Sequence, residues 1–153
     1  MSNVYADVVP NLELLIPDLL GKILKKNMKL FAMTDSKGGN VFHLAAFWNE
    51  PRVFELLRPE TEYLARERDR NGDLPIHIAS TMGHAALIEK LHTVSQSVNG
   101  RGETVLHVAA KYGRDKAVKY ILRHPNMGEM INERDHAGNT PSHLAVMYSH
   151  PPL

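Results

Sequence analysis

Apolar residues recur at the i, i+3, i+4 spacing of one helix face in three stretches of the chain. The stretches hold Val53, Phe54, Leu56 and Leu57; Leu87, Ile88 and Leu91; and Val118, Ile121 and Leu122. Small residues, such as Ala45-Ala46 and Ala109-Ala110, precede them and would let a neighbouring helix approach closely. The pattern predicts pairs of short helices that pack against one another.

Four segments with the same arrangement of residues surround these stretches. They read DSKGGNVFHLAAFWNE from Asp35, DRNGDLPIHIASTMGH from Asp69, NGRGETVLHVAAKYGR from Asn99 and DHAGNTPSHLAVMYSH from Asp135. In each segment a histidine lies eight residues after the Asp or Asn and five after a glycine, and successive histidines are 34, 30 and 36 residues apart. One supersecondary unit is therefore stacked four times.

Each unit can be interpreted from its turn and cap residues. Asp or Asn followed by x-x-Gly predicts a tight hairpin, because the side chain bonds nearby backbone N–H groups and glycine supplies a positive φ. Thr104 and Thr140 can then cap a helix, in whose first turn Pro141 is tolerated. Gly83 and Gly113, six residues past the histidine, end that helix. The unit is hairpin, helix, turn, helix.

The segments TPSHLA and TVLHVA resemble the core signature of the ankyrin repeat, T-P-L-H-x-A. The resemblance covers roughly residues 34 to 150 and implies an all-α solenoid of stacked helix-turn-helix units with β-hairpin loops. Two copies depart from the signature: Asn40 and Val41 replace Thr and Pro in the first, and Leu74 replaces Thr in the second. We expect these changes to weaken a helix cap.

The repeats divide the chain into two parts. Residues 1–33 are expected to form a degenerate pair of capping helices that covers one end of the stack. Residues 34–153 hold the repeats 35–68, 69–98, 99–134 and 135–153. The last repeat is incomplete, because the chain reaches HPPL without a second helix, and Leu144 and Met147 lose their usual neighbours.

Three segments are similar in sequence to the plant membrane-ankyrin proteins of the accelerated-cell-death type. They read INERDHAGNTPSHLAVMYSHP, RDRNGDLPIHIASTMGH and ETVLHVAAKYG. This resemblance implies a role in defence or stress signalling. In that family the ankyrin stack faces the cytosol and is followed by a transmembrane domain that this sequence lacks. The chain would then be a truncated relative or a cytosolic part, and no membrane or transport role carries over.

Composition narrows the range of functions. Of 153 residues, 43% are hydrophobic and 23% charged, as in ordinary globular proteins. The net charge of +1, with scattered basic residues, gives no argument for nucleic acid or for an anionic membrane. The chain has no cysteine, no secretion signal and no apolar run long enough to cross a bilayer. These features favour a cytoplasmic location and no insertion into the membrane.

The regular histidines raise the question of catalysis. Catalytic zinc needs three ligands that converge on one point, whereas equivalent positions in a stack are about 10 Å apart. The sequence also contains no H-E-x-x-H, G-x-S-x-G, phosphate loop or dinucleotide motif. We therefore expect no metal, cofactor or enzyme activity, and leave a histidine-based metal hydrolase as a remote alternative. A structural role, tying each hairpin to a helix, is expected for His43, His77, His107 and His143.

Stacked units curve, and their hairpins and first helices form a concave face that is free to carry recognition. Four pairs of residues lie four and five positions past each histidine: Phe47-Trp48, Thr81-Met82, Lys111-Tyr112 and Met147-Tyr148. The hairpins add a mostly basic rim of Lys37, Arg70, Asn71, Arg101 and His136. Both sets are candidate contacts for a protein partner with an acidic or mixed surface, although some of the pairs could instead pack against the neighbouring unit.

The sequence thus predicts a module that binds another protein, of unknown identity, through its concave face. A second interpretation is self-association. In that case the exposed apolar end around Leu144, Met147 and Leu153 would pair with another copy.

Overall fold

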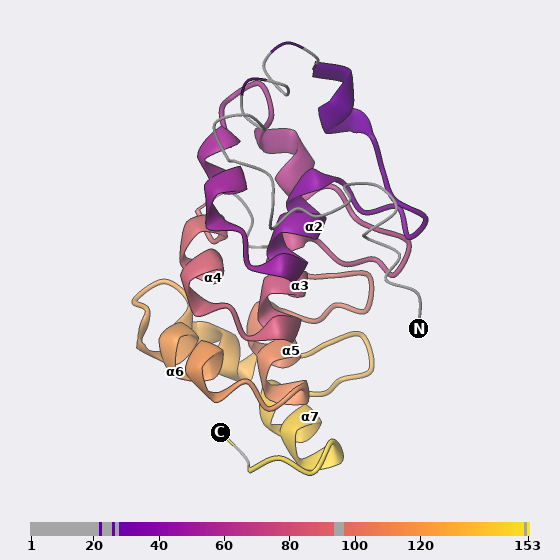
Figure 1. Cartoon of the computed structure of the whole chain (residues 1–153). Coiled ribbons are helices and arrows are strands. Elements are labelled where there is room, and N and C mark those ends of the chain that lie inside the picture. The colour runs from indigo at the N-terminus through magenta and orange to yellow at the C-terminus, as the bar shows by residue number, and fades with distance from the viewer. Residues whose placement is uncertain (1–21, 23–25, 27, 94–96, 152) are drawn as a thin grey trace.

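A computed structural model describes residues 22, 26, 28–93, 97–151 and 153 of the chain. Four helices, α2 (Val41–Trp48), α3 (Pro75–Met82), α5 (Val105–Lys111) and α7 (Pro141–Met147), stack into one column (Figure 1). The helices α4 (Ala85–Leu91) and α6 (Asp115–Arg123) lie along one side of the column, and the connecting loops project from the other. This is the expected solenoid of helix pairs.

Short 3-10 helices fill the remaining positions. They are η2 (Met28–Ala32), η3 (Pro51–Leu56), η4 (Glu62–Arg66) and η5 (Gly128–Asn132). Here η3 takes the place of the second helix that we expected for the first unit. Among the described residues no segment forms a β-strand, so the loops are hairpin-shaped turns rather than paired strands.

The core lies between the column of first helices and the second helices, α4 and α6, that lie along its side. Phe42, Ile76 and Leu106 of the first helices are fully buried, as are Leu87 and Ile121 of the second helices. Burying one such side chain stabilises the fold by about 1.5–3 kcal/mol. The apolar stripes in the sequence therefore do what their spacing predicts, which is to hold neighbouring units together.

The caps of the first helices differ from the expectation in one unit. Asn40 caps α2 well, because its Oδ1 accepts hydrogen bonds from the N–H groups of Phe42, at 3.0 Å, and His43, at 3.4 Å. Asparagine is as good a cap as threonine, so the expected weakening at Asn40 was wrong. Leu74 makes no side-chain cap on α3, as its apolar side chain requires.

Each first helix is followed by a residue in the left-handed conformation, six positions past the histidine. Gly83 and Gly113 fill this position with φ of 78° and 63°, and end their helices as the sequence predicts. In the first and last units the residues are Asn49, with φ 56°, and Ser149, with φ 62°. The same turn therefore forms without glycine, at a conformational cost that is larger for serine than for asparagine.

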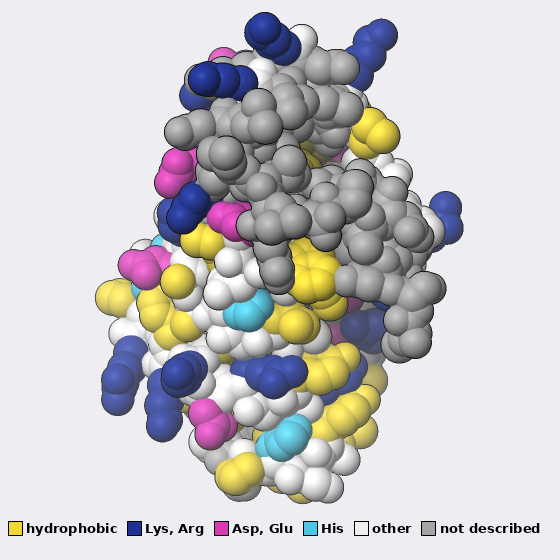
Figure 2. Space-filling view, viewed as in Figure 1, with side chains coloured by type: hydrophobic (Ala, Val, Ile, Leu, Met, Phe, Trp, Pro, Cys, Tyr) yellow, Lys and Arg dark blue, Asp and Glu magenta, His cyan; other side chains and the backbone are white. Residues whose placement is uncertain are grey.

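Most of the expected N-terminal cap, residues 1–33, lies outside the described residues. Of the helices in the described part of the chain, none has the length and apolar character needed to traverse a membrane. On the outer side of the stack α6 exposes Lys116, Lys119 and Arg123, and Figure 2 shows basic side chains gathered over this helix.

Candidate functional site: the hairpin and first-helix face

The four hairpins are built by the same side-chain bonds. In each, Oδ1 of the leading Asp or Asn accepts from the backbone N–H groups two and four residues later. Asp35 receives N–H bonds of 2.8 Å from Lys37 and Gly39, and Asn99 receives bonds of 3.0 and 2.9 Å from Arg101 and Glu103. Asp69 and Asp135 repeat the pattern. The hairpins are therefore rigid frames that fix where their exposed side chains point.

Backbone bonds then join each hairpin to the next. The N–H of Arg70 donates to the carbonyl of Lys37 at 2.8 Å, that of Gly100 to Gly72 at 2.8 Å, and that of His136 to Arg101 at 3.0 Å. The glycines at positive φ allow this approach. A Cβ on Gly102, for example, would collide with His136, whereas a Cβ on Gly138 would meet nothing within 4 Å.

The repeated histidines of the first three units bond within their own unit through Nδ1 and to the next hairpin through Nε2. Nδ1 of His77 accepts from the N–H of Leu74 at 3.3 Å, and its Nε2 lies 3.1 Å from the carbonyl oxygen of Glu103 in the next hairpin. Because Nδ1 accepts, the ring proton sits on Nε2 and is donated to that carbonyl. His43 reaches Asp73 in the same way at 2.9 Å.

The third histidine follows the same pattern as the first two, and the fourth does not. Nδ1 of His107 accepts from the N–H of Thr104 at 3.1 Å, and its Nε2 lies 2.9 Å from the carbonyl oxygen of Asn139. His143 keeps the first bond, to Thr140 at 3.1 Å, but it is exposed, and among the described residues its Nε2 has no partner. Three histidines thus join one unit to the next, and the fourth acts within its own unit.

Burial also sets the protonation of these rings. It lowers the pKa of His77 to about 4, and it lowers the pKa of His43 as well. Both rings are therefore neutral near pH 7 and suited to a fixed hydrogen bond. In the described part of the chain no group of three or more His, Asp or Glu side chains could hold a metal ion. The histidines do not form the convergent site that a metal hydrolase needs.

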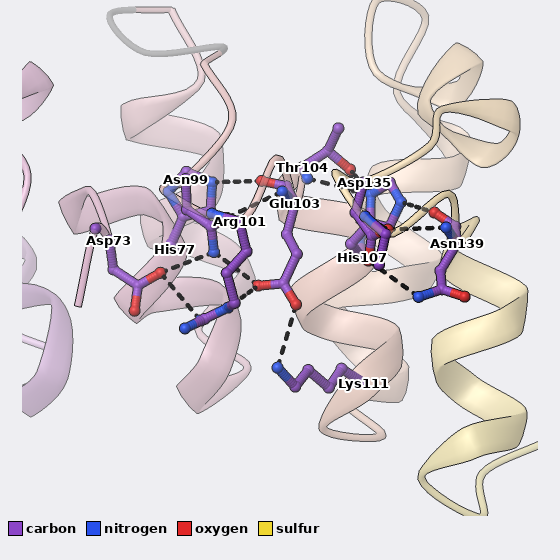
Figure 3. A network of polar contacts seen from close by, with 12 residues as sticks. Asp73, His77, Asn99, Arg101, Glu103, Thr104, His107, Lys111, Asp135 and Asn139 are labelled. Atoms are coloured by element: carbon purple, nitrogen blue, oxygen red, sulfur yellow. Dashed lines mark hydrogen bonds and ion pairs between the residues drawn. The ribbon is translucent and has the colours of Figure 1, made fainter.

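A polar network connects the second and third hairpins to α5 (Figure 3). At its centre is Glu103, whose side chain is only 3% exposed. Its carboxylate accepts from Asn99 Nδ2 at 2.7 Å, Arg101 Nε at 3.0 Å and Lys111 Nζ at 3.1 Å. Burial alone would raise the pKa of Glu103, but the three donors outweigh it and lower that pKa below its usual value.

The sequence alone did not single out Glu103. It directly precedes the capping residue Thr104, and its partner Lys111 lies eight residues later, two turns along α5. The opposite charges of Glu103 and Lys111, eight residues apart, were the feature of the sequence that could have indicated this ion pair. Because Lys111 is bound to Glu103 and its side chain is 12% exposed, it is a tethered cation rather than a freely projecting one.

The candidate contact pairs fall into two groups by exposure. Phe47, Trp48, Thr81 and Met82 are half-buried, and the Phe47 and Trp48 rings contact each other edge-on at 5.3 Å. In the last two units Tyr112 is 42% exposed, Met147 64% and Tyr148 49%. Tyr112 and Tyr148 both face Lys111, whose Nζ lies 5.7 and 5.3 Å from the two ring centroids.

The rim residues lie on the hairpins as expected. Arg70, Asn71, Arg101 and His136 are exposed, and Lys37 is half-buried. Nη1 of Arg70 donates to the carbonyl of Ser36 at 2.7 Å, so this side chain also bridges two hairpins. Within the predicted set, Arg101 and Lys111 both bind Glu103, and Tyr112 and Tyr148 both lie beside Lys111.

Comparison with known proteins supports the repeat assignment. Residues 83–153 match the family model described as ankyrin repeats (3 copies). Similar proteins include the ankyrin repeat domain-containing protein SAT10 of Stachybotrys chartarum, 29% identical over 83% of this chain and 7% of that protein. Human transient receptor potential cation channel subfamily A member 1 is 30% identical over 76% of this chain and 11% of the channel.

A third similar protein is the nuclear factor NF-kappa-B p105 subunit of Gallus gallus, which is 30% identical over 81% of this chain and 13% of that subunit. The chain therefore spans only a small part of the relatives that it matches.

Proposed function

The chain is built from ankyrin repeats, and we propose that it is a non-catalytic module that binds a protein partner through the face formed by its hairpins and first helices. Ankyrin repeats generally serve protein–protein interaction. One observation carries the assignment to this face: Tyr112 and Tyr148 are exposed and both lie beside Lys111, on a framework fixed by hydrogen bonds, and Met147 next to Tyr148 is exposed as well. Tyrosine gives large contact area at low entropic cost, and methionine adapts to the shape of a partner.

The hydrogen bonds of the repeated histidines and of Glu103 support binding rather than catalysis. The histidines of the first three units are engaged at both ring nitrogens, and Glu103 is held by three donors. No base is left poised beside a nucleophile in this arrangement, as acid–base or nucleophilic catalysis would need.

The resemblance to the plant accelerated-cell-death-type proteins supports a role in defence or stress signalling. By the same resemblance the partner would be met in the cytoplasm, or at the cytosolic face of a membrane if the chain is part of a longer protein. Capture of partners from plant tissue, by the wild-type chain, tests this assignment. Recovery of no protein above an unrelated control module would contradict it.

The face itself is tested by substitution once a partner is captured. The double variant Tyr112→Ala/Tyr148→Ala should weaken the partner's binding about 100-fold, because two exposed aromatic contacts are lost. Its thermal unfolding should stay close to that of the wild type. Tyr63→Ala, which removes a 53% exposed tyrosine outside this face, is the matched control. Unchanged affinity in the double variant would refute the face.

Trp48 needs a separate variant because it is half-buried and contacts Phe47. Trp48→Ala combines any loss of a partner contact with a loss of packing. A change in its affinity for the partner therefore has to be compared with the thermal unfolding of the same variant, which measures the loss of packing.

Self-association is the second candidate, and the fourth unit supplies its support. Of the three residues expected at this surface, Met147 is 64% and Leu153 38% exposed, whereas Leu144 is buried at 4% because it packs into the core, so its expected exposure was wrong. Val146, which is 60% exposed, adds to the apolar surface, and a Cβ on Gly138 would meet nothing within 4 Å. A second copy could cover this apolar surface. Sedimentation over a wide range of concentrations tests it: monomer throughout excludes a dimer, and a dimer that Val146→Glu disperses supports this candidate.

A further inference from the structure

The charge arrangement around Glu103 indicates what kind of partner the exposed tyrosines receive. The acidic members of the network are on the inside: the side chain of Glu103 is 3% exposed and that of Asp73 13%. The basic member Arg101 is on the outside, with half of its side-chain surface accessible. An approaching partner therefore meets a cation, although the network as a whole is close to neutral.

The carboxylate of Glu103 already accepts three hydrogen bonds, whereas the guanidinium of Arg101 does not use all of its donors. Arg101 donates through Nε to Glu103 at 3.0 Å, and its Nη2 lies 3.8 Å from Asp73, which is too long for a hydrogen bond. A guanidinium has five N–H donors, so Arg101 keeps donors that can bind a carboxylate from solution in the two-point manner that arginine favours.

The apolar part of the surface is adjacent to this cation. Tyr112 and Tyr148 lie around the ammonium of Lys111, which is itself bound to the same Glu103 as Arg101. Met147 precedes Tyr148 and is the most exposed of the three. A partner segment here would place apolar side chains on the tyrosines and an acidic one on Arg101.

The spacing of the tyrosines fits an extended segment. They occupy equivalent positions in neighbouring units, which are about 10 Å apart in a stack of helices. A segment in the polyproline II conformation advances about 3.1 Å per residue with three residues per turn, so three residues cover about one unit and bring the side chain back to the same side of the segment. Two apolar side chains three positions apart would therefore each meet one tyrosine, with the residues between them near Arg101.

We propose that the third and fourth units bind an extended acidic segment of a protein partner, with apolar residues three positions apart on Tyr112 and Tyr148 and a carboxylate on Arg101. This inference rests on the proposed function and specifies its partner's chemistry. A basic segment is disfavoured because it would meet Arg101 and Lys111, whose counter-charges are buried.

A direct binding measurement tests the proposal. The probe is a fluorescent, unstructured peptide of about 12 residues with two leucines three positions apart and glutamates between and beside them. Fluorescence anisotropy should show saturable binding that weakens with added salt. Replacing the glutamates by lysines, or the leucines by serines, should each reduce affinity at least roughly tenfold.

Variants of the protein locate the peptide. Tyr148→Ala and Arg101→Gln should each weaken binding of the acidic peptide roughly tenfold, the glutamine still offering an N–H to Glu103. Lys119→Gln removes the same charge from the exposed side of α6 and should leave binding unchanged. Equal or tighter binding of the lysine peptide, equal loss in all three variants, or no saturable binding would overturn the proposal.

The failure of this inference can be told apart from failure of the proposed function. If a captured partner depends on Tyr112 and Tyr148 but the acidic peptide does not bind, the face is correct and the acidic segment is wrong. If no captured partner depends on these tyrosines and the acidic peptide does not bind, both proposals are wrong.

Discussion

The third and fourth units contain the same motif in two environments. His107 is completely buried and bonds both its own cap residue, Thr104, and the next hairpin at Asn139. His143 makes the same cap bond to Thr140, yet it is exposed. The motif by itself therefore specifies the start of a helix, and only the neighbouring unit turns its histidine into a connection between units.

The candidate contact residues of the two units also differ in their surroundings and exposure. Tyr112 belongs to the third unit, whose charges are paired through Glu103, whereas Met147 and Tyr148 belong to the fourth unit, which has no second helix of its own among the described residues. Exposure rises along the stack, from half-buried Trp48 to Met147. Surface available for a partner is thus concentrated where the packing between units is least complete.

The largest expected effect tests the difference between the two histidines. His107→Ala should lower the free energy of unfolding by about 4 kcal/mol, because it leaves buried groups of Thr104 and Asn139 without a partner and opens a cavity. His143→Ala should cost at most about 1 kcal/mol, since water can replace its bond. Urea unfolding measures both, and equal losses would contradict the comparison.

Acid should weaken the internal units through His77. Its pKa in the folded chain is about 4, below the unfolded value of 6.5. Between these values the unfolded state binds more protons, so stability is complete above pH 6.5 and falls as the pH drops toward 4. The loss attributable to His77 approaches about 3 kcal/mol. Urea unfolding from pH 7 to pH 4.5 should show it, and His77→Gln should flatten the curve. An unchanged pH slope in that variant would refute this origin.

Replacing Glu103 should have a smaller effect that distinguishes the third hairpin from the fourth. Glu103→Gln leaves a neutral acceptor beside Lys111 and Arg101, and should cost about 2 kcal/mol. The carboxylate's pKa is lowered in the fold, so its contribution is present above pH 4.5 and is lost as the pH falls further. Asn139, at the equivalent position of the fourth hairpin, is the control: Asn139→Ala should cost under about 1 kcal/mol, as its side chain makes only a 3.5 Å contact with Asp135. Thermal unfolding of both variants at pH 7 measures the difference, and equal costs would contradict it.

The smallest effect concerns the turn after the first helix. The third unit has Gly113 at this point and the fourth has Ser149, both at positive φ. Ser149→Gly should raise stability by about 0.5 kcal/mol, because relief of the left-handed strain exceeds the entropy that glycine adds to the unfolded chain. Asn49→Gly should gain less, since asparagine tolerates this conformation. A stability loss in Ser149→Gly, measured by calorimetry, would contradict the account of the turn.

The comparison also shows what could be predicted from the sequence. Turn residues and apolar spacing act locally, so they predicted the hairpins, the helix starts at Thr104 and Thr140, and the ends at Gly83 and Gly113. The polar network could not be predicted as readily, because Asn99 and Asp73 meet only after two hairpins have stacked. Exposure of the contact pairs likewise depends on neighbouring units, and their role in binding stays a prediction.

We infer that partners bind on the surface of the third and fourth units. An NMR titration of the isotope-labelled chain with a captured partner tests it most directly. We expect the signals of Arg101, Tyr112, Met147 and Tyr148 to shift together and saturate, while those of Lys116, Lys119 and Arg123 on α6 stay in place. Shifts confined to α6, with the signals of the two tyrosines unmoved, would contradict it.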